Sequence, residues 1–262
     1  MAGEAAAAPR VLLLGGTAEA AALTERLAAR GDLRLTTRLA GVTCSPRQLQ
    51  GEVVVGGFGG AAALARHLHE QNVAALVDAT HPYAVRIARN ARRAALAADV
   101  PRLKLWRPAW TSGPGYRWLE AGDVAEAGRL AAAVGRRPLV TLGGRGLEGF
   151  DLAPFERAVV RAIEAPPGLP TNAAWLKARG PFALEDERRL LVERGIDVVV
   201  TKNAGGDGAR AKLDAARALG LPVVMIARPI PPPGALAASV EEVRAWLDQL
   251  LASRQTRWRS GA

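Results

Sequence analysis

The sequence predicts an α/β protein of two halves, each built around a parallel β-sheet covered by helices. Short apolar runs that end in glycine or in polar turns alternate with longer stretches of helix-forming residues. This alternation stops at a segment rich in proline and glycine, and then it resumes. The 262 residues, of which 49% are hydrophobic and 23% charged, suffice for one large domain or two compact ones with a sizeable core.

In the first half, the predicted strands are separated by helices of strong helix formers. Residues 18–30 consist mostly of Ala, Leu, Glu and Arg, and Gly31 supplies a stop. The predicted strands are 11–14, 33–39, 52–55, 74–78 and 102–106, and the predicted helices are 18–30, 61–71 and 85–98. Strands and helices at this spacing form βαβ units, so we expect a parallel sheet with helices on both faces.

A segment without periodicity separates the two halves. Residues 108–117 contain Pro108, Gly113, Pro114 and Gly115, and we interpret them as a linker. Beyond it the predicted helices are 124–134, 184–194, 209–219 and 240–252, and the predicted strands are 139–142, 157–164, 197–201 and 223–227. The expected organisation is a disordered tail (1–9), a first domain (10–107), the linker, a second domain (118–252) and a basic tail (253–262).

Composition narrows the classes of partner. The only cysteine, Cys44, excludes an intrachain disulfide and is typical of a reducing cytoplasm, where we expect the protein. No run approaches 18 apolar residues, so no membrane partner is expected, and residues 1–9 lack the basic start of a signal peptide. The net charge of +10 favours an anionic partner. Because basic residues are scattered and no nucleic-acid motif occurs, we expect a small anionic ligand rather than nucleic acid.

The turns that leave the strands are the candidate sites, because open parallel sheets bind ligands at the carboxyl ends of their strands. Gly15-Gly16-Thr17-Ala18-Glu19-Ala20 precedes a helix and suits a phosphate, although the pattern also fits a plain tight turn. The second strand ends in Thr36-Thr37-Arg38 rather than in the carboxylate that grips a ribose without a 2′-phosphate. Arg38 pairs with a 2′-phosphate, so NADPH is favoured unless Arg38 is merely solvated.

Two further turns of the first half carry candidate groups. Gly56-Gly57-Phe58-Gly59-Gly60 lets the backbone approach a flat ligand, with Phe58 either covering that ligand or filling the core. Asp78-Ala79-Thr80-His81-Pro82-Tyr83 ends the fourth strand, and its histidine is either catalytic or structural. Arg86, in the first turn of the next helix, either faces the ligand or is solvated. His67 and His69 lie two apart on a helix and share no face, so no metal site is expected.

The second half has three comparable turns. They are Thr141-Leu142-Gly143-Gly144-Arg145, Arg179-Gly180-Pro181-Phe182 and Thr201-Lys202-Asn203-Ala204-Gly205-Gly206. Only four of the 35 basic residues are lysines, and two of these, Lys202 and Lys212, flank the glycine pair of the last turn. A lysine in such an arginine-rich chain indicates a compact point charge or a proton donor, although chance placement stays open.

With these turns in their order, the chain resembles the precorrin-6A reductase family of cobalamin (vitamin B12) biosynthesis. The motifs that carry the resemblance are LGGTAEA (14–20), LAG (39–41), VGGFGG (55–60), VDATHPY (77–83), RPAW (107–110), ARGPF (178–182) and VTKNAGG (200–206). The chain departs from the family pattern at Thr37-Arg38, Val42 and Tyr83, and Gly143-Gly144-Arg145 is open to a one-residue offset. The groups that hold the 2′-phosphate therefore stay open, with Arg38 as our choice.

The resemblance implies two Rossmann-like domains with parallel sheets and a ligand cleft between them. It implies an NADPH-dependent oxidoreductase that delivers hydride to one ring double bond of precorrin-6A, with a proton added at the neighbouring carbon, to give precorrin-6B. The substrate, a polycarboxylated tetrapyrrole, suits the cationic surplus of the chain. A cobalt-precorrin-6A reductase of the anaerobic route and a non-catalytic NADPH- or tetrapyrrole-binding module are the alternatives, and both a monomer and a homodimer stay open.

The turns and the resemblance together give three groups of expected site residues. The catalytic proton donor is Lys202 or His81, with solvent as the alternative. NADPH binding is assigned to Gly15, Gly16, Thr17, Glu19, Thr37, Arg38, Gly57, Phe58, Gly59, Asp78, Ala79, Thr80 and His81. Substrate binding is assigned to Arg86, Arg145, Arg179, Lys202, Asn203, Gly205, Gly206 and Lys212.

Overall fold

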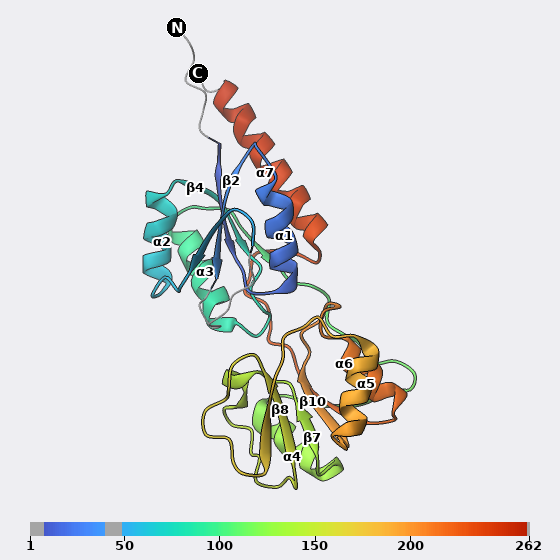
Figure 1. Ribbon diagram of the computed structural model, residues 1–262. Helices are drawn as coiled ribbons and strands as arrows, with labels where there is room; N and C mark the ends of the chain where they lie inside the picture. Colours follow the sequence, from blue (N-terminus) through green and yellow to red (C-terminus); the bar gives the residue numbers. More distant parts are fainter. Residues whose placement is uncertain (1–7, 40–48, 261–262) are drawn as a thin grey trace. The chain divides into compact units, whose positions relative to one another are not determined.

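The computed structural model describes residues 8–39 and 49–260, with the backbone alone at residue 145 and at residues 254–260 (Figure 1). The chain divides into two compact units. Unit 1 comprises Met1–Arg107 and Pro229–Ala262, and unit 2 comprises Pro108–Arg228. Cys44 and Val42 lie outside the described residues, as does most of the LAG motif.

Unit 1 is built on a six-stranded sheet in the order β12-β5-β4-β1-β2-β3, with every neighbouring pair parallel. Its strands are β1 (Arg10–Leu14), β2 (Arg34–Leu39), β3 (Glu52–Val55), β4 (Val73–Asp78), β5 (Arg102–Leu105) and β12 (Ala235–Ala237). Its helices are α1 (Ala18–Ala28), α2 (Ala61–Glu70), α3 (Val85–Ala97) and α7 (Val240–Ser260).

Helices cover both faces of this sheet, because the strands are apolar on both sides. Side chains alternate along a strand, so Val11 and Leu13 of β1 pack on one face, in a core with α1 and α7. Leu12 and Leu14 pack on the other face, in a core with α2 and α3. Figure 1 shows the two helix layers on either side of the sheet. A strand buried on both faces is typical of parallel sheets and explains the unbroken apolar run of β1.

Unit 2 contains a second six-stranded parallel sheet, in the order β6-β11-β10-β7-β8-β9. Its strands are β6 (Arg117–Ala121), β7 (Pro138–Val140), β8 (Ala158–Ala162), β9 (Ala173–Lys177), β10 (Val198–Lys202) and β11 (Pro222–Ile226). Its helices are α4 (Val124–Val134), the 3-10 turn η1 (Gly144–Leu147), α5 (Leu184–Glu193) and α6 (Ala211–Ala218).

In both sheets the order in which the chain adds strands reverses at one point, which makes both units Rossmann-like. In unit 1 the chain runs outward from β1 through β2 to β3 and then returns to place β4 on the other side of β1. In unit 2 it runs outward from β7 through β8 to β9 and then places β10 on the other side of β7. Doubly wound sheets bind their ligands at this switch point, outside the carboxyl ends of the strands. The predicted α/β class with two parallel sheets is confirmed.

The structure differs from the predicted domain boundaries at two places. The last helix belongs to unit 1, where Val243, Leu247 and Leu251 are buried in the core beside α1, and β12 pairs with β5. The segment interpreted as a linker belongs to unit 2, because Trp110 is only 5% exposed in its core. The assignment of residues 229–252 to the second domain and the linker over 108–117 are therefore wrong. An amphipathic pattern shows that a helix buries one face, but it does not show which sheet receives that face.

Candidate functional site

Two turns meet at the switch point of unit 1. Thr17, the residue before α1, caps the helix by accepting a hydrogen bond from the Ala20 N–H at 3.1 Å. The same hydroxyl donates to the carbonyl oxygen of Ala79 at 3.0 Å, and the Ala79 N–H donates to the Leu14 carbonyl at 2.9 Å. The structure thus brings the Gly15–Thr17 turn and the Ala79 turn together at the carboxyl ends of β1 and β4.

The glycines of the first turn leave room for a phosphate. Gly16 has a φ of +122°, and a Cβ added there would meet nothing within 4 Å, so the backbone is open on that side. At Gly15 a Cβ would lie 3.1 Å from Leu39, which keeps this residue small where the turn packs on β2. An open backbone at the N-terminus of α1 supplies N–H donors and the positive end of the helix dipole. The residues present fit the diphosphate of a dinucleotide.

Arg38 and Phe58 form a platform at the carboxyl end of β2. The Arg38 guanidinium carbon lies 4.3 Å from the centroid of the Phe58 ring, and its Nε donates to the Gly56 carbonyl at 3.0 Å. The His67 ring of α2 packs against Phe58, with the two ring centroids 5.0 Å apart. Burial, and after it the Arg38 charge, lower the pKa of His67. The terminal nitrogens of Arg38 are donors suited to a phosphate.

Two other predicted cofactor residues are engaged within the protein. Thr37 is fully buried, with its hydroxyl 3.1 Å from that of Thr24 on α1, because alternate residues of β2 face that helix. Direct contact of Thr37 with a cofactor is therefore not supported. Glu19 accepts a hydrogen bond from Arg107 at 2.6 Å in a partly buried ion pair. Burial lowers the pKa of Arg107, opposed by the Glu19 charge.

The turn after β4 is shaped by its own aspartate. The Asp78 carboxylate is fully buried, and its Oδ1 accepts from the Thr80 N–H at 3.1 Å and from the Thr80 hydroxyl at 2.6 Å. His81 is half-buried, and its Nδ1 accepts from the Tyr83 N–H at 3.3 Å. Arg86 is exposed in the first turn of α3. The structure places His81 and Arg86 at the surface next to the switch point, whereas Asp78 and Ala79 lie beneath it.

Lys202 closes the switch point of unit 2. It is the last residue of β10, and its Nζ donates to the Leu142 carbonyl, beyond the end of β7, at 3.0 Å. Gly146 of η1 packs so closely on this ammonium that an added Cβ would overlap with it. Burial lowers the pKa of Lys202. Two of the three turns predicted for the second half, 141–145 and 201–206, therefore meet here, as the turns after β1 and β4 do in unit 1.

The turn after β10 is held by Trp110. The side-chain amide of Asn203 is engaged at both ends with the Trp110 backbone, at 2.8 Å to its N–H and 2.9 Å to its carbonyl. The Trp110 ring N–H donates to the Gly206 carbonyl at 2.8 Å. Arg228 donates from Nε to the Asn203 carbonyl at 3.1 Å. Asn203, predicted to bind substrate, is therefore a clamp within the protein, while Gly205 and Gly206 form the turn that it holds.

The remaining predicted substrate residues differ in exposure. Arg179 is exposed two residues beyond β9. Lys212 is buried, 4% exposed, with its ammonium 2.6 Å from the Ala209 carbonyl and 5.0 Å from the Trp110 ring centroid. Burial and the nearby Arg161 charge lower its pKa to about 7. A substrate cannot reach a side chain so placed, so this prediction is not supported. The side chain of Arg145 lies outside what the structure describes.

The sequence reasoning missed three side chains that shape these turns. Lys104 is fully buried and donates to Asp78, Trp110 clamps the Asn203 turn, and Arg228 donates to the carbonyls of Asn203 and Ala204. For Lys104 a signal existed, because it is one of the four lysines in an arginine-rich chain. Trp110 ends the RPAW motif, but no local pattern shows the roles of Trp110 and Arg228, because their partners lie far away in the sequence.

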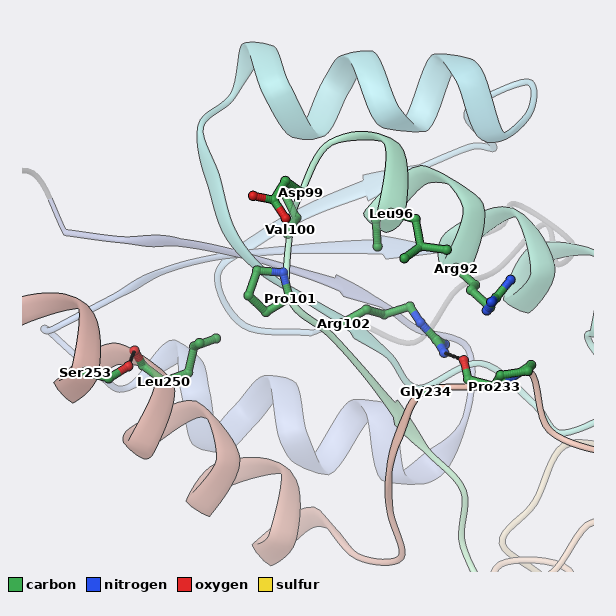
Figure 2. A pocket seen from close by; sticks show the side chains of 11 residues that line it. Arg92, Leu96, Asp99, Val100, Pro101, Arg102, Pro233, Gly234, Leu250 and Ser253 are labelled. Atoms are coloured by element: carbon green, nitrogen blue, oxygen red, sulfur yellow. Dashed lines mark hydrogen bonds between the residues drawn. The ribbon is translucent and has the colours of Figure 1, made fainter. Parts of the chain in front are cut away.

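A pocket of about 620 Å³ lies elsewhere in unit 1. Figure 2 shows Arg92 of α3, Arg102 of β5 and Leu250 of α7 around it, with Arg102 bonded to the Pro233 carbonyl. Pro101 and Arg102 stand at the amino end of β5, so this pocket is distinct from the carboxyl-end turns.

Among the described residues, no group of three or more His, Cys, Asp and Glu side chains is placed to hold a metal ion. In that same part of the chain, no helix has the length and apolar character needed to cross a bilayer.

Comparison with known proteins agrees with this architecture. The family described as precorrin-6x reductase CbiJ/CobK matches residues 10–248. A precorrin-6A reductase of Rhodococcus erythropolis is 44% identical, over 92% of this chain and 98% of its own. A cobalt-precorrin-6A reductase of Synechocystis sp. is 30% identical, over 93% of this chain and 97% of its own. A solved structure, CobK precorrin-6A reductase, is 38% identical and has a TM-score of 0.87. The match covers 92% of this chain and 97% of that one. This chain therefore belongs to the precorrin-6x reductase CbiJ/CobK family.

Proposed function

We propose that this protein is a precorrin-6A reductase of cobalamin biosynthesis that uses NADPH to reduce one ring double bond and gives precorrin-6B. The observation that carries the proposal is 44% identity with a precorrin-6A reductase along nearly the whole of both chains. The identity with a cobalt-precorrin-6A reductase is 30% over a similar length, so the metal-free macrocycle is the favoured substrate. A reductase implies a nicotinamide cofactor in general, and the phosphorylated form is our inference from the residues of unit 1.

The diphosphate of NADPH is proposed to lie on the Gly15–Thr17 turn. Support comes from the strand order of unit 1, which puts its switch point there, and from the open backbone at Gly16. When bound, NADPH supplies the hydride. The chain's part is to hold the nicotinamide within about 3–3.5 Å of the acceptor carbon and to keep its orientation.

Arg38 is proposed to hold the 2′-phosphate. It stands at the carboxyl end of β2, where a carboxylate would repel that phosphate and instead grip an unphosphorylated ribose. Its stack on Phe58 and its bond to the Gly56 carbonyl restrict the guanidinium before any ligand arrives. A guanidinium ordered in advance loses less conformational entropy on binding a phosphate.

The substrate is proposed to be held through its carboxylates. Arg86 in unit 1 and Arg179 in unit 2 are exposed cations beyond the ends of strands, and Gly206 offers half-buried backbone without a side chain, whereas Gly205 is buried against Pro108 and Arg228. Lys202 and His81 are the proposed proton donors for the carbon next to the one that receives hydride, with solvent as the alternative. Burial lowers the pKa of Lys202, which makes its ammonium a stronger acid.

Anaerobic assays with both macrocycles test this function. Precorrin-6A and cobalt-precorrin-6A are each mixed with NADPH and the protein, and the loss of nicotinamide absorbance is followed together with the macrocycle spectrum. We expect a higher kcat/KM with precorrin-6A, and the reverse order would make the protein a cobalt-precorrin-6A reductase. If NADPH binds but is not oxidised in a single turnover with either macrocycle, the protein is a non-catalytic binding module. In the same assay, wild-type turnover by Lys202→Ala at saturating substrate would leave Lys202 a binding role only.

A further inference from the structure

Lys104 is a buried lysine whose three donors all go to the turn after β4. It lies on β5, directly opposite Asp78 of β4, and it is 0% exposed. Its Nζ lies 2.9 Å from Asp78 Oδ1, 2.9 Å from the Thr80 carbonyl and 3.0 Å from the Thr80 hydroxyl. An ammonium has three N–H donors, so this group is fully satisfied by two residues of one turn.

The position suits lysine and no other cation. The flat guanidinium of arginine spreads its donors in a plane, whereas these acceptors surround a single point. The chain uses lysine at only four of its 35 basic positions, and this one is enclosed completely. Composition bias toward arginine therefore does not explain the residue, but its bonding geometry does.

The charge of Lys104 balances a carboxylate that water does not reach. Asp78 is 0% exposed, and its Oδ1 accepts from Lys104 while Arg102 lies 3.8 Å from its Oδ2. Burial lowers the pKa of Lys104, and the Asp78 charge opposes that shift. Removing Lys104 would leave the buried Asp78 carboxylate with Arg102, 3.8 Å away, as its counter-charge in place of a hydrogen-bonded ammonium, which costs more than the pair contributes when intact.

The bonds of Lys104 reach the proposed cofactor turn through one residue. Ala79 stands between Asp78 and Thr80, the two residues that Lys104 holds. The Ala79 carbonyl accepts from the Thr17 hydroxyl, and the Ala79 N–H donates to Leu14, so Ala79 links β4 to the turn before α1. A change in the turn after β4 would therefore displace the cap of α1 at the proposed diphosphate site.

We propose that Lys104 is a positioning residue for NADPH: it holds the Asp78–Thr80 turn against the Gly15–Thr17 turn in the conformation that binds the diphosphate. The inference rests on the proposed function, because it takes the switch point of unit 1 as the NADPH site. Lys104 does not touch the ligand in this account, and its effect is carried by Asp78, Ala79 and Thr80.

Lys104→Met tests the proposal, with Val77→Ala as the matched control. Met keeps the length of the side chain but removes the donors. Val77→Ala instead weakens the packing of the neighbouring strand β4 and leaves Asp78 in place. The readouts are the dissociation constant of NADPH from protein fluorescence, the unfolding temperature, and KM and kcat. For Lys104→Met we expect the dissociation constant and the KM of NADPH to rise about tenfold or more, with kcat at saturating NADPH within about twofold. For Val77→Ala we expect a lower unfolding temperature with NADPH affinity within about twofold.

Lys104→Arg keeps the charge and is the second test variant, which can be measured if Lys104→Met does not fold. Because the guanidinium cannot donate to all three acceptors, its NADPH affinity is also expected to fall about tenfold. NADPH affinity at the wild-type level in Lys104→Met or in Lys104→Arg would overturn the inference. So would an equal loss of affinity in Val77→Ala. If the wild type itself fails to bind NADPH, both the proposed function and this inference fail. If the wild type and the Lys104 variants bind NADPH equally well, only this inference fails.

Discussion

Most polar side chains near the two switch points bond to their own protein. Thr17 and Thr80 connect turns, Asn203 clamps a backbone, and Lys212 is enclosed beside Trp110. Buried polar groups need partners, because leaving one unpaired costs about 1–3 kcal/mol. Arg38 is half-exposed, and Arg86 and Arg179 are exposed. These three cations are therefore the ones that we propose meet a ligand.

Arg38 should set the preference between the two nicotinamide cofactors. In Arg38→Ala the 2′-phosphate loses its charge-assisted hydrogen bonds, while NADH has no such group. We expect kcat/KM with NADPH to fall about tenfold to a hundredfold, and kcat/KM with NADH to stay within about twofold. Arg34→Ala, an exposed arginine at the amino end of the same strand, is the control and should change neither value. Equal losses with both cofactors would show that Arg38 does not recognise the 2′-phosphate.

Lys212 should make stability depend on pH. Its pKa is lowered by burial to about 7 in the folded protein, from an ordinary value of 10.5. Between these values the unfolded chain binds a proton that the native protein does not, so native stability rises with pH. Relative to Lys212→Met, the free energy of unfolding of the wild type should rise from about pH 7 to about pH 10, by up to about 1.4 kcal/mol per pH unit. Urea unfolding across this range measures it, and a difference that stays constant with pH would contradict it.

At the scale of elements, glycines with a positive φ differ in how closely the rest of the protein packs on them. Gly205 has a φ of +68°, and a Cβ there would overlap with the Pro108 carbonyl and with Arg228. Gly149 has a φ of +83° but open space around its Cα. Both positions disfavour alanine through the backbone, and only Gly205 adds a steric clash.

Gly205→Ala should therefore destabilise unit 2 far more than Gly149→Ala does. We expect the free energy of unfolding to fall by about 3 kcal/mol or more in the first variant and by about 1 kcal/mol in the second. Chemical unfolding followed by tryptophan fluorescence measures both, since Trp110 and Trp118 lie in unit 2. Similar losses in the two variants would show that the turn shifts to accommodate the added methyl group.

Elements with strong apolar or periodic patterns were predictable, including the edge strand β3, but the other three edge strands of the two described sheets were not. The apolar runs of β1, β4 and β10 and the helix α1 lie within two residues of their predicted positions, because burial on both faces leaves a plain signal. The strands β6, β9 and β12 were not predicted. Each lies at the edge of its sheet and pairs with one neighbour only, so its sequence needs no continuous apolar run.

At the scale of the whole molecule, unit 1 is formed from two separate segments of the chain. The chain leaves unit 1 after Arg107, forms unit 2, and returns to add the edge strand β12 and helix α7 to unit 1. In unit 2, β6 comes first in the sequence and lies at one edge of the sheet, with β9 at the other. Each unit has its own buried core, so we expect two unfolding transitions.

This division predicts which core mutation NADPH can offset. Leu247 of α7 is 0% exposed in unit 1, and Leu213 of α6 is 1% exposed in unit 2, so replacing either with alanine should cost its own unit about 2–5 kcal/mol. NADPH at a hundred times its dissociation constant adds about 2.7 kcal/mol to the unit that binds it. Calorimetry should therefore show NADPH raising the lowered transition of Leu247→Ala and not that of Leu213→Ala. If it raises the lowered transition of both variants or of neither, NADPH binding is not confined to unit 1.

The sequence by itself determined the α/β class, the alternation of strands and helices, the glycine turns and the resemblance to one reductase family, because these depend on local patterns of burial and turn chemistry. Only the tertiary structure decided which strands are neighbours, that the turns after β1 and β4 and those after β7 and β10 meet in pairs, and that α7 completes unit 1. It also decided that Lys104, Lys212 and Asn203 bond inside the protein. The physical reason is that strand pairing and side-chain burial depend on contacts between residues far apart in the chain, and no local pattern specifies the partner in such a contact.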